Sequence, residues 1–227
     1  AHEINTPLGV ILGYTQLMMD EFDKNGEVYE NLQIIERQTK ACRKIVTDLL
    51  KFSRQTDRVK AEVDLNELID EVLTVSEHNL NISHIQVTRC FFPGLPKIIG
   101  DAEKLRQVFI NLLNNSQDAI TNGGEITIAT RHDRDSGEIV ATVLDTGTGI
   151  AEDIKPKIFD PFFTTKEIGK GTGLGLSVTY GIIRDHGGSI AVESPVADPE
   201  TGKKRQGAAF RLRLPMASEQ KAVNEVD

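Results

Sequence analysis

The first 55 residues repeat apolar side chains at the spacing of packed helices, and this pattern constrains the fold more than any other feature of the chain. Steps of four and three residues alternate along two stretches, as they do in helices that pack along a shared seam. The seam residues are Ile4, Leu8, Ile11, Thr15, Met18 and Phe22 in the first stretch, and Val28, Leu32, Ile35, Thr39, Cys42, Val46 and Leu49 in the second. The pattern predicts two α-helices.

A short polar connection at residues 23–27 separates the two stretches and contains Gly26. Short connections join antiparallel neighbours, so we expect a helical hairpin. Two helices bury little apolar surface by themselves, and two chains can cover that surface by forming a four-helix bundle. We therefore expect a homodimer through residues 1–55. The alternative is a coiled-coil spacer, which is what most heptad repeats are.

Charge and cysteine content exclude several classes of protein. The net charge of -8 over 227 residues argues against a nucleic-acid binder, which would carry a basic face. Two cysteines, Cys42 and Cys90, are too few for a disulfide framework or a zinc site. Hydrophobic residues make up 39% of the chain, which is enough to bury a core.

No apolar run approaches the roughly 18 residues of a membrane span, and no signal peptide is visible. We expect the residues present here to be cytoplasmic. The chain begins at Ala1 and not at Met, so we expect a piece of a longer protein. A membrane anchor, if the longer protein has one, would lie in a missing N-terminal region.

The hydrophobic pattern changes after the hairpin. Residues 56–62 are polar and aperiodic, which predicts a linker, and residues 63–215 mix helical and strand patterns, which predicts an α/β domain. The expected helices are 65–79, 102–121 and 173–186, and the expected strands are 85–92, 97–99, 125–131, 138–145, 189–193 and 207–214. The last residues, 216–227, have little apolar content and predict a flexible tail.

A long irregular stretch between Asp145 and Gly173 is bounded by two glycine-rich segments. Long irregular loops in compact domains are usually functional lids or disordered segments, and the flanking glycines favour a lid. The first segment, Asp145-Thr146-Gly147-Thr148-Gly149, follows a predicted strand. Its carboxylate can accept a hydrogen bond from an exocyclic amine, and its glycines would let the backbone approach a flat ring. By itself this segment is equally typical of a turn.

The second segment, Gly169-Lys170-Gly171-Thr172-Gly173-Leu174-Gly175, opens the next predicted helix. Exposed backbone N–H groups at a helix N-terminus can hold an anion such as phosphate. The spacing is not that of a Walker A loop, and by itself such a segment is more often a helix cap than a phosphate site. The two segments together, on either side of a lid, are more specific.

Asn111 and Asn115 stand four residues apart on the predicted helix 102–121, so they share one face of it. Their neighbours Leu112 and Leu113 point into the core instead. Amide oxygens are suitable ligands for Mg²⁺, which often bridges substrate phosphates. Asn pairs in general are more often solvated or capping amides.

Five motifs in order resemble those of the catalytic core of two-component sensor histidine kinases, and the nitrogen-regulation type is the most similar. The resemblance covers about residues 1–215. The motifs are the H box at residues 2–8, the N box at residues 111–116, the first G box at residues 145–149, the F box from Phe159, and the second G box at residues 171–176. It implies an α+β fold, in which a dimeric helical hairpin precedes a two-layer α/β sandwich of the Bergerat ATP-binding type.

The resemblance implies that His2 is phosphorylated from ATP and passes the phosphoryl group to an aspartate of a response-regulator receiver domain. Glu3 would polarise the imidazole or accept its proton, and Thr6 would orient water in a reverse phosphatase reaction. The helical pattern agrees, because with Ile4 and Leu8 on the seam, His2 and Thr6 fall on the outer face. A lone His at a helix start is otherwise more often a cap or a surface residue.

The resemblance also implies an ATP site with Mg²⁺ held by Asn115 and aided by Asn111. The residues that it assigns to nucleotide binding are Asn111, Asn115, Asp118, Asp145, Gly147, Gly149, Phe159, Lys166, Gly171, Thr172, Gly173, Leu174 and Gly175. Adenine would lie against Asp145, and the phosphates would lie against the second G box and Lys166. We expect Phe159, Phe162 and Phe163 to anchor the lid by apolar burial, unless they are ordinary core residues.

Two other functions fit parts of the sequence. ATPases of the gyrase and mismatch-repair type contain a segment similar to residues 115–119, but they place a catalytic Glu four residues before the Asn. The chain has Asn111 there, and an amide cannot act as a base, which favours transfer to His2 over hydrolysis. A pseudokinase scaffold that binds nucleotide without turnover is the other alternative, although every expected chemical group is present.

Overall fold

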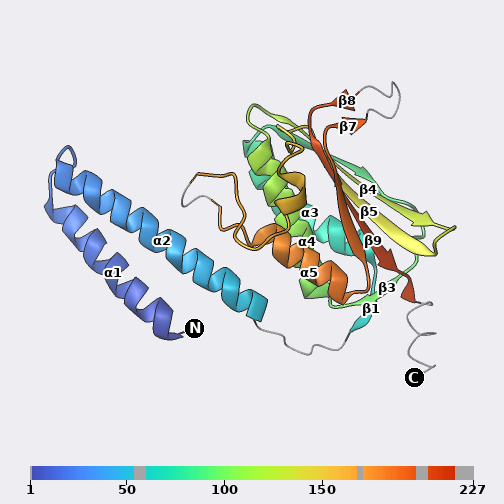
Figure 1. Ribbon diagram of the computed structural model, residues 1–227, viewed down its shortest axis with the longest axis horizontal. Helices are drawn as coiled ribbons and strands as arrows, with labels where there is room; N and C mark the ends of the chain where they lie inside the picture. The colour runs from blue at the N-terminus through green and yellow to red at the C-terminus, as the bar shows by residue number, and fades with distance from the viewer. Residues whose placement is uncertain (1, 54–59, 168–170, 198–203, 218–227) are drawn as a thin grey trace. The chain divides into compact units, whose positions relative to one another are not determined.

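A computed structural model describes residues 2–53, 60–167, 171–197 and 204–217 (Figure 1). The Cα positions divide into two compact units, one of residues 1–57 with 160–174 and the other of residues 58–159 with 175–227. None of the helices among the described residues combines the length and the apolarity that a bilayer crossing requires.

The hairpin predicted from the heptads is present in the first unit as α1 (His2–Glu21) and α2 (Glu27–Ser53) (Figure 1). The connection is closed by the backbone N–H of Gly26, which donates to the carbonyl of Asp23 at 3.0 Å. Gln16 donates from Nε2 to Glu36 at 2.9 Å and joins the two helices midway along the hairpin.

The seam of the hairpin is only partly covered within one chain. Among the seam side chains that the structure describes, Thr15, Leu32 and Thr39 are buried. Six others remain 41–51% exposed, namely Ile4, Ile11, Met18, Phe22, Val28 and Ile35. This apolar stripe meets water unless a second surface covers it, which is the physical reason to expect a four-helix bundle.

The second unit packs three helices against one face of a five-stranded sheet (Figure 1). The helices are α3 (Leu65–Ile82), α4 (Ala102–Ala119) and α5 (Gly175–Asp185). The strands, in sheet order, are β2 (Ile85–Cys90), β4 (Gly124–Asp133), β5 (Glu138–Asp145), β9 (Ala208–Pro215) and β6 (Ser189–Glu193). Only the β2–β4 pair of this sheet is parallel. The result is the two-layer sandwich that the sequence predicted.

The core between the layers is aliphatic, with Phe109 as its largest fully buried side chain. The helices α3 and α4 begin at aspartate N-caps: Asp64 accepts from the N–H of Glu67, and Asp101 accepts from the N–H groups of Glu103 and Lys104.

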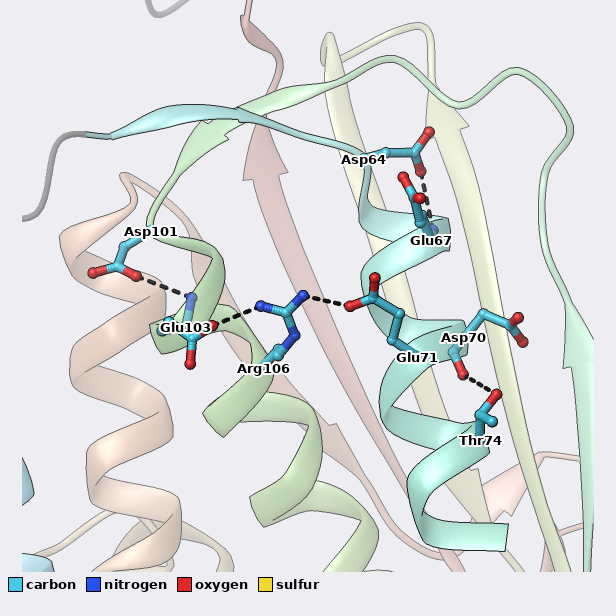
Figure 2. A network of polar contacts seen from close by, with 8 residues as sticks. All are labelled: Asp64, Glu67, Asp70, Glu71, Thr74, Asp101, Glu103 and Arg106. Carbon is cyan, nitrogen blue, oxygen red and sulfur yellow. Dashed lines mark hydrogen bonds and ion pairs between the residues drawn. The ribbon is translucent and has the colours of Figure 1, made fainter.

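Arg106 of α4 joins the outer surfaces of α3 and α4 (Figure 2). Its guanidinium forms ion pairs with Glu71 of α3 and, at 2.8 Å, with Glu103 of α4. These partly exposed ion pairs are worth little individually, so the helix layer depends mainly on the buried apolar contacts.

Several elements differ from the expectations. Ala61 and Glu62, assigned to the linker at 56–62, lie in β1 (Ala61–Val63), which pairs antiparallel with β3 (Ile98–Gly100). A three-residue strand shows too little alternation to be recognised, and only its pairing defines it. The same holds for β7 (Val196–Ala197) and β8 (Lys204–Arg205), and the loop contains a short 3₁₀ helix at Lys155–Lys157. Residues 54–55 of the predicted hairpin, 56–59 of the linker and 218–227 of the tail lie outside the described residues.

Candidate active site

The helix α4 presents Asn111, Asn115 and Asp118 on one face, because they are separated by four and three residues. Leu112 and Leu113 point away from this face and are buried in the core, as their place in the helical pattern predicted. The two amides are half-buried and the carboxylate of Asp118 is exposed.

Asp145 is the last residue of β5, and its carboxylate is held in place on both oxygens. The residue is 2% exposed. The backbone N–H groups of Gly147 and Ala208 donate to Oδ1 at 2.9 and 3.2 Å, and the hydroxyl of Ser116 donates to Oδ2 at 3.3 Å. Burial raises the pKa of Asp145, while these three hydrogen bonds lower it. The site therefore offers one oriented acceptor.

Gly147 lies against the end of α4. A Cβ on Gly147 would lie 2.7 Å from both the Cβ and the carbonyl oxygen of Ala119, so no larger residue fits. The sequence suggested that this glycine lets the backbone approach a flat ring, whereas the close approach seen in the structure is to protein atoms. The backbone N–H of Thr148 donates to the carbonyl of Ala119 at 3.0 Å and fastens the turn to the same helix end.

Asn111 connects α4 to the start of α5. Its Nδ2 donates to the carbonyl of Gly175 at 3.1 Å and to the hydroxyl of Thr179 at 3.4 Å. With the amino group turned toward α5, the Oδ1 of Asn111 is the atom that can face a ligand, which suits a hard cation such as Mg²⁺. Among the described residues no group of three or more His, Cys, Asp and Glu side chains gathers at one point.

Gly171 and Gly173 of the second glycine segment pack closely against residues 162–166 within the first unit. The backbone N–H of Phe162 donates to the carbonyl of Gly173 at 3.0 Å. Both residues have positive φ, 67° for Phe162 and 66° for Gly173. Gly173 therefore precedes the helix, and α5 begins at Gly175, two residues later than the sequence predicted. A Cβ on Gly171 would lie 2.5 Å from the hydroxyl of Thr164 and 3.1 Å from the Cβ of Lys166.

The three phenylalanines do not behave alike. Phe162 is 59% exposed, so the expectation that it anchors the loop by burial is wrong. Its φ is positive, which is uncommon for a bulky residue. Phe159 is half-buried, and its ring centroid lies 5.6 Å from that of Tyr180 on α5. Phe163 is also half-buried.

The structure adds residues that the sequence analysis did not single out. Ser116 and the backbone of Ala208 hold Asp145, Thr179 meets Asn111, and Tyr180 meets Phe159. Ser116 follows Asn115 directly, so its place beside the site could have been noticed. Ala208 and Thr179 reach the site through the pairing of β5 with β9 and the packing of α4 on α5, and Tyr180 meets Phe159 where the loop contacts α5.

His2 is the first described residue of α1, in the other unit from Asp145. The side chains of His2 and Glu3 lie outside the described ones. Thr6 is exposed on α1, in agreement with the outward face that the heptad pattern predicted.

Comparison with known families matches both parts of the chain. The sequence model of the family described as histidine kinase-, DNA gyrase B- and HSP90-like ATPase matches residues 100–218. The model of the His Kinase A (phospho-acceptor) domain matches residues 1–58.

Curated relatives agree. The chain is 37% identical to sporulation kinase A of Bacillus subtilis (strain 168), over 95% of this chain and 33% of that protein. It is 35% identical to sensor histidine kinase ZraS of Escherichia coli (strain K12), over 95% of this chain and 44% of that protein. The chain thus spans less than half the length of these relatives.

Two solved structures have the same architecture. Full-length ShkA in complex with AMPPNP superposes with a TM-score of 0.70 and 26% identity, covering 95% of this chain and 44% of that one. Histidine kinase ThkA in complex with the response regulator protein TrrA gives 0.69 and 29%, covering 97% and 60%.

The chain belongs to the family of histidine kinase-, DNA gyrase B- and HSP90-like ATPases. Its phospho-acceptor region makes it, within that family, the catalytic core of a two-component histidine kinase. The predicted fold, a helical hairpin followed by an ATP-binding sandwich, is confirmed.

Proposed function

We propose that the chain transfers the γ-phosphoryl group of ATP to His2 and from there to an aspartate of a response-regulator receiver domain. The observation that carries this proposal is the amide of Asn111, which donates to Gly175 on α5. A gyrase-type ATPase needs a carboxylate at this position to activate water. An amide cannot accept the proton, so the site favours transfer to a protein nucleophile over hydrolysis.

The nucleotide is assigned to the face that α4 and the end of β5 share. The exocyclic amine of adenine donates to the carboxylate of Asp145, whose orientation the hydrogen bonds from Gly147, Ala208 and Ser116 support. The remaining nucleotide contacts are assigned to Asn115, Asp118, Gly149, Phe159, Lys166, Gly171, Thr172, Gly173, Leu174 and Gly175. The ATP analogue in the ShkA complex supports nucleotide use by this fold.

Mg²⁺ is assigned to the amide oxygens of Asn115 and Asn111, since the amino group of Asn111 already faces α5. When bound, Mg²⁺ neutralises charge on the phosphates. Asn111 thus has two tasks, and its contact with Gly175 orients its oxygen.

The neutral imidazole of His2 attacks the γ-phosphorus. A P–N bond forms, the bond to the ADP oxygen breaks, and Glu3 accepts the imidazole proton. Positioning and charge neutralisation supply most of the rate, because phosphoryl transfer needs little covalent help from the protein. The phosphoryl group then passes to the aspartate carboxylate of the receiver, and Thr6 orients water in the reverse dephosphorylation.

The receiver domain is assigned to the outer face of α1. Val10, Tyr14 and Leu17 lie one, two and three helical turns beyond Thr6 on that face and are 53–67% exposed. Exposed apolar residues in such a row are typical of a docking surface. The ThkA complex with its response regulator supports this class of partner, and the uncovered stripe of seam residues supports the homodimer.

Incubation with ATP labelled at the γ-phosphate and Mg²⁺ tests the proposal. We expect a protein-bound label that is lost in acid and kept in alkali, as phosphohistidine requires, and no label on His2→Gln. Steady phosphate release without protein label would instead support the ATPase alternative. Undiminished labelling of His2→Gln would refute the assignment of the nucleophile.

A further inference from the structure

The segment between Phe159 and Gly175 is fastened at both of its ends. The chain passes from the second unit into the first between residues 159 and 160, and it returns to the second unit between residues 174 and 175. Phe159 and Gly175 are therefore the second-unit residues that directly flank the segment. A contact inside the second unit holds each of them.

Phe159 is held by an aromatic pair. Its ring centroid lies 5.6 Å from that of Tyr180, with the rings inclined at 41°. This tilted arrangement is favourable for aromatic rings and fixes the ring of Phe159 beyond what burial alone would do. Tyr180 lies on α5 and is 42% exposed, so burial in the core does not explain why a tyrosine occupies this position.

Gly175 is held by the amide of Asn111, which donates to its carbonyl at 3.1 Å and to Thr179 at 3.4 Å. Thr179 is completely buried. Thr179 and Tyr180 are consecutive residues of α5, so one turn of this helix contributes to both fastenings.

A third contact closes the segment upon itself. Within the first unit, Phe162 donates from its backbone N–H to the carbonyl of Gly173 at 3.0 Å. This hydrogen bond joins the two directions of the chain three residues after Phe159 and two residues before Gly175. We call Phe159, Phe162, Gly173 and Gly175 the neck of the segment.

We propose that Tyr180 is a positioning residue for phosphoryl transfer, which acts through Phe159 by fixing one side of the neck. This inference rests on the proposed function, because Lys166 and Gly171 lie beyond the neck and are the groups assigned to the phosphates. When the ring of Tyr180 is removed, Phe159 loses its aromatic partner, while Gly175 keeps its hydrogen bond from Asn111. The phosphate-binding groups then start from a less defined position, which lowers the probability of the reactive geometry.

The full chain with Tyr180→Ala, Tyr180→Phe and Arg184→Gln, an exposed residue one turn further along α5, tests the inference. We expect Tyr180→Ala to lower kcat/KM for His2 labelling by roughly threefold to tenfold, the range expected for one aromatic pair. Tyr180→Phe keeps the ring and should restore wild-type kinetics, and Arg184→Gln should leave them unchanged. Equal rates for Tyr180→Ala and Arg184→Gln would overturn the inference.

A double-mutant cycle with Phe159→Ala separates positioning from general packing. If Tyr180 acts through Phe159, Tyr180→Ala causes no further loss in the Phe159→Ala background. Fully additive losses would show that Tyr180 acts elsewhere, and would overturn the inference.

Tryptic cleavage after Lys166 gives a readout that needs no catalysis. We expect faster cleavage in Tyr180→Ala than in Arg184→Gln, with Tyr180→Phe again resembling wild type. If wild type forms no phosphohistidine, the proposed function fails and the cleavage rates still decide whether Tyr180 fixes the neck. If wild type is labelled but both kinetics and cleavage are unaffected by Tyr180→Ala, only this inference fails.

Discussion

The backbone N–H of Ala208 donates to Oδ1 of Asp145 at 3.2 Å, although 63 residues separate them in sequence. The two residues face each other in the antiparallel register of β5 with β9. The first strand thus ends in a carboxylate, and the next strand in the sheet begins with the N–H that orients it. The carboxylate of Asp145, the predicted adenine acceptor, is therefore oriented by a backbone N–H of the neighbouring strand.

Replacing Asp145 should remove the adenine acceptor. In Asp145→Asn an NH₂ donor replaces one carboxylate oxygen and cannot accept the hydrogen bond from the exocyclic amine of adenine, so we expect ATP affinity to fall about tenfold to a hundredfold, as for loss of a hydrogen bond to a charged group. Calorimetric titration with a non-hydrolysable ATP analogue measures the change. Asp153→Asn, on the exposed surface, is the control. An unchanged affinity in Asp145→Asn would remove this residue from adenine recognition.

Buried His186 predicts a loss of stability in mild acid. Its Nε2 accepts from the backbone N–H of Asp101 at 3.0 Å, and its Nδ1 donates to the carbonyl of Ile182 at 2.7 Å. Burial is the largest cause that lowers the pKa of His186 below its usual 6.5, with Lys60 and Lys104 acting in the same direction. Protonation would place a proton on the nitrogen that accepts from Asp101.

The lowered pKa of His186 determines how the free energy of unfolding changes with pH. As pH falls through 6.5, the unfolded chain binds the proton before the folded chain does, so the free energy of unfolding decreases until the folded-state pKa is reached. Urea unfolding at pH 7.5 and 5.5 measures this. We expect His186→Asn to lose about 1–3 kcal/mol at pH 7.5 and to show less decrease at pH 5.5, whereas exposed His78→Gln behaves like wild type. An equal decrease in His186→Asn would contradict the assignment.

Gly147→Ala should destabilise the domain and weaken nucleotide binding together. Its Cβ would overlap Ala119 at the end of α4, and the backbone shift that relieves this overlap moves the N–H that donates to Asp145. We expect a loss of about 1–3 kcal/mol in the free energy of unfolding. Gly181→Ala on α5 is the matched control, because open space surrounds its Cβ position and alanine favours a helix. Equal free energies of unfolding for the two variants would show that the end of α4 shifts at little cost, and would contradict the prediction.

A charge on the exposed seam should prevent self-association. Ile11 is 45% exposed in one chain, and in the proposed four-helix bundle it would be buried. Ile11→Glu would then place an unpaired charge in the bundle core, at a cost of several kcal/mol. Light scattering during gel filtration should show a dimer for wild type and a monomer for Ile11→Glu. Gln33→Glu adds the same charge at an exposed position of α2 and should remain dimeric.

The sequence by itself determined the long helices, the strands of the five-stranded sheet and the order of the motifs. The heptads predict α1 and α2 because a helical seam repeats within a few residues, and the helical pattern over 102–121 predicts α4 for the same local reason. Asn111, Asn115 and Asp145 could be chosen as site candidates because their residue types and spacing are visible along the chain.

Tertiary structure alone decided how those candidates are held. The amide of Asn111 faces Gly175 because α4 packs on α5, and Asp145 receives the N–H of Ala208 because β5 pairs with β9. The exposure of Phe162 and its positive φ, which a bulky side chain rarely adopts, are likewise not visible in the sequence. Such contacts join residues distant in sequence, where periodicity carries no information, so only the packed fold determines them.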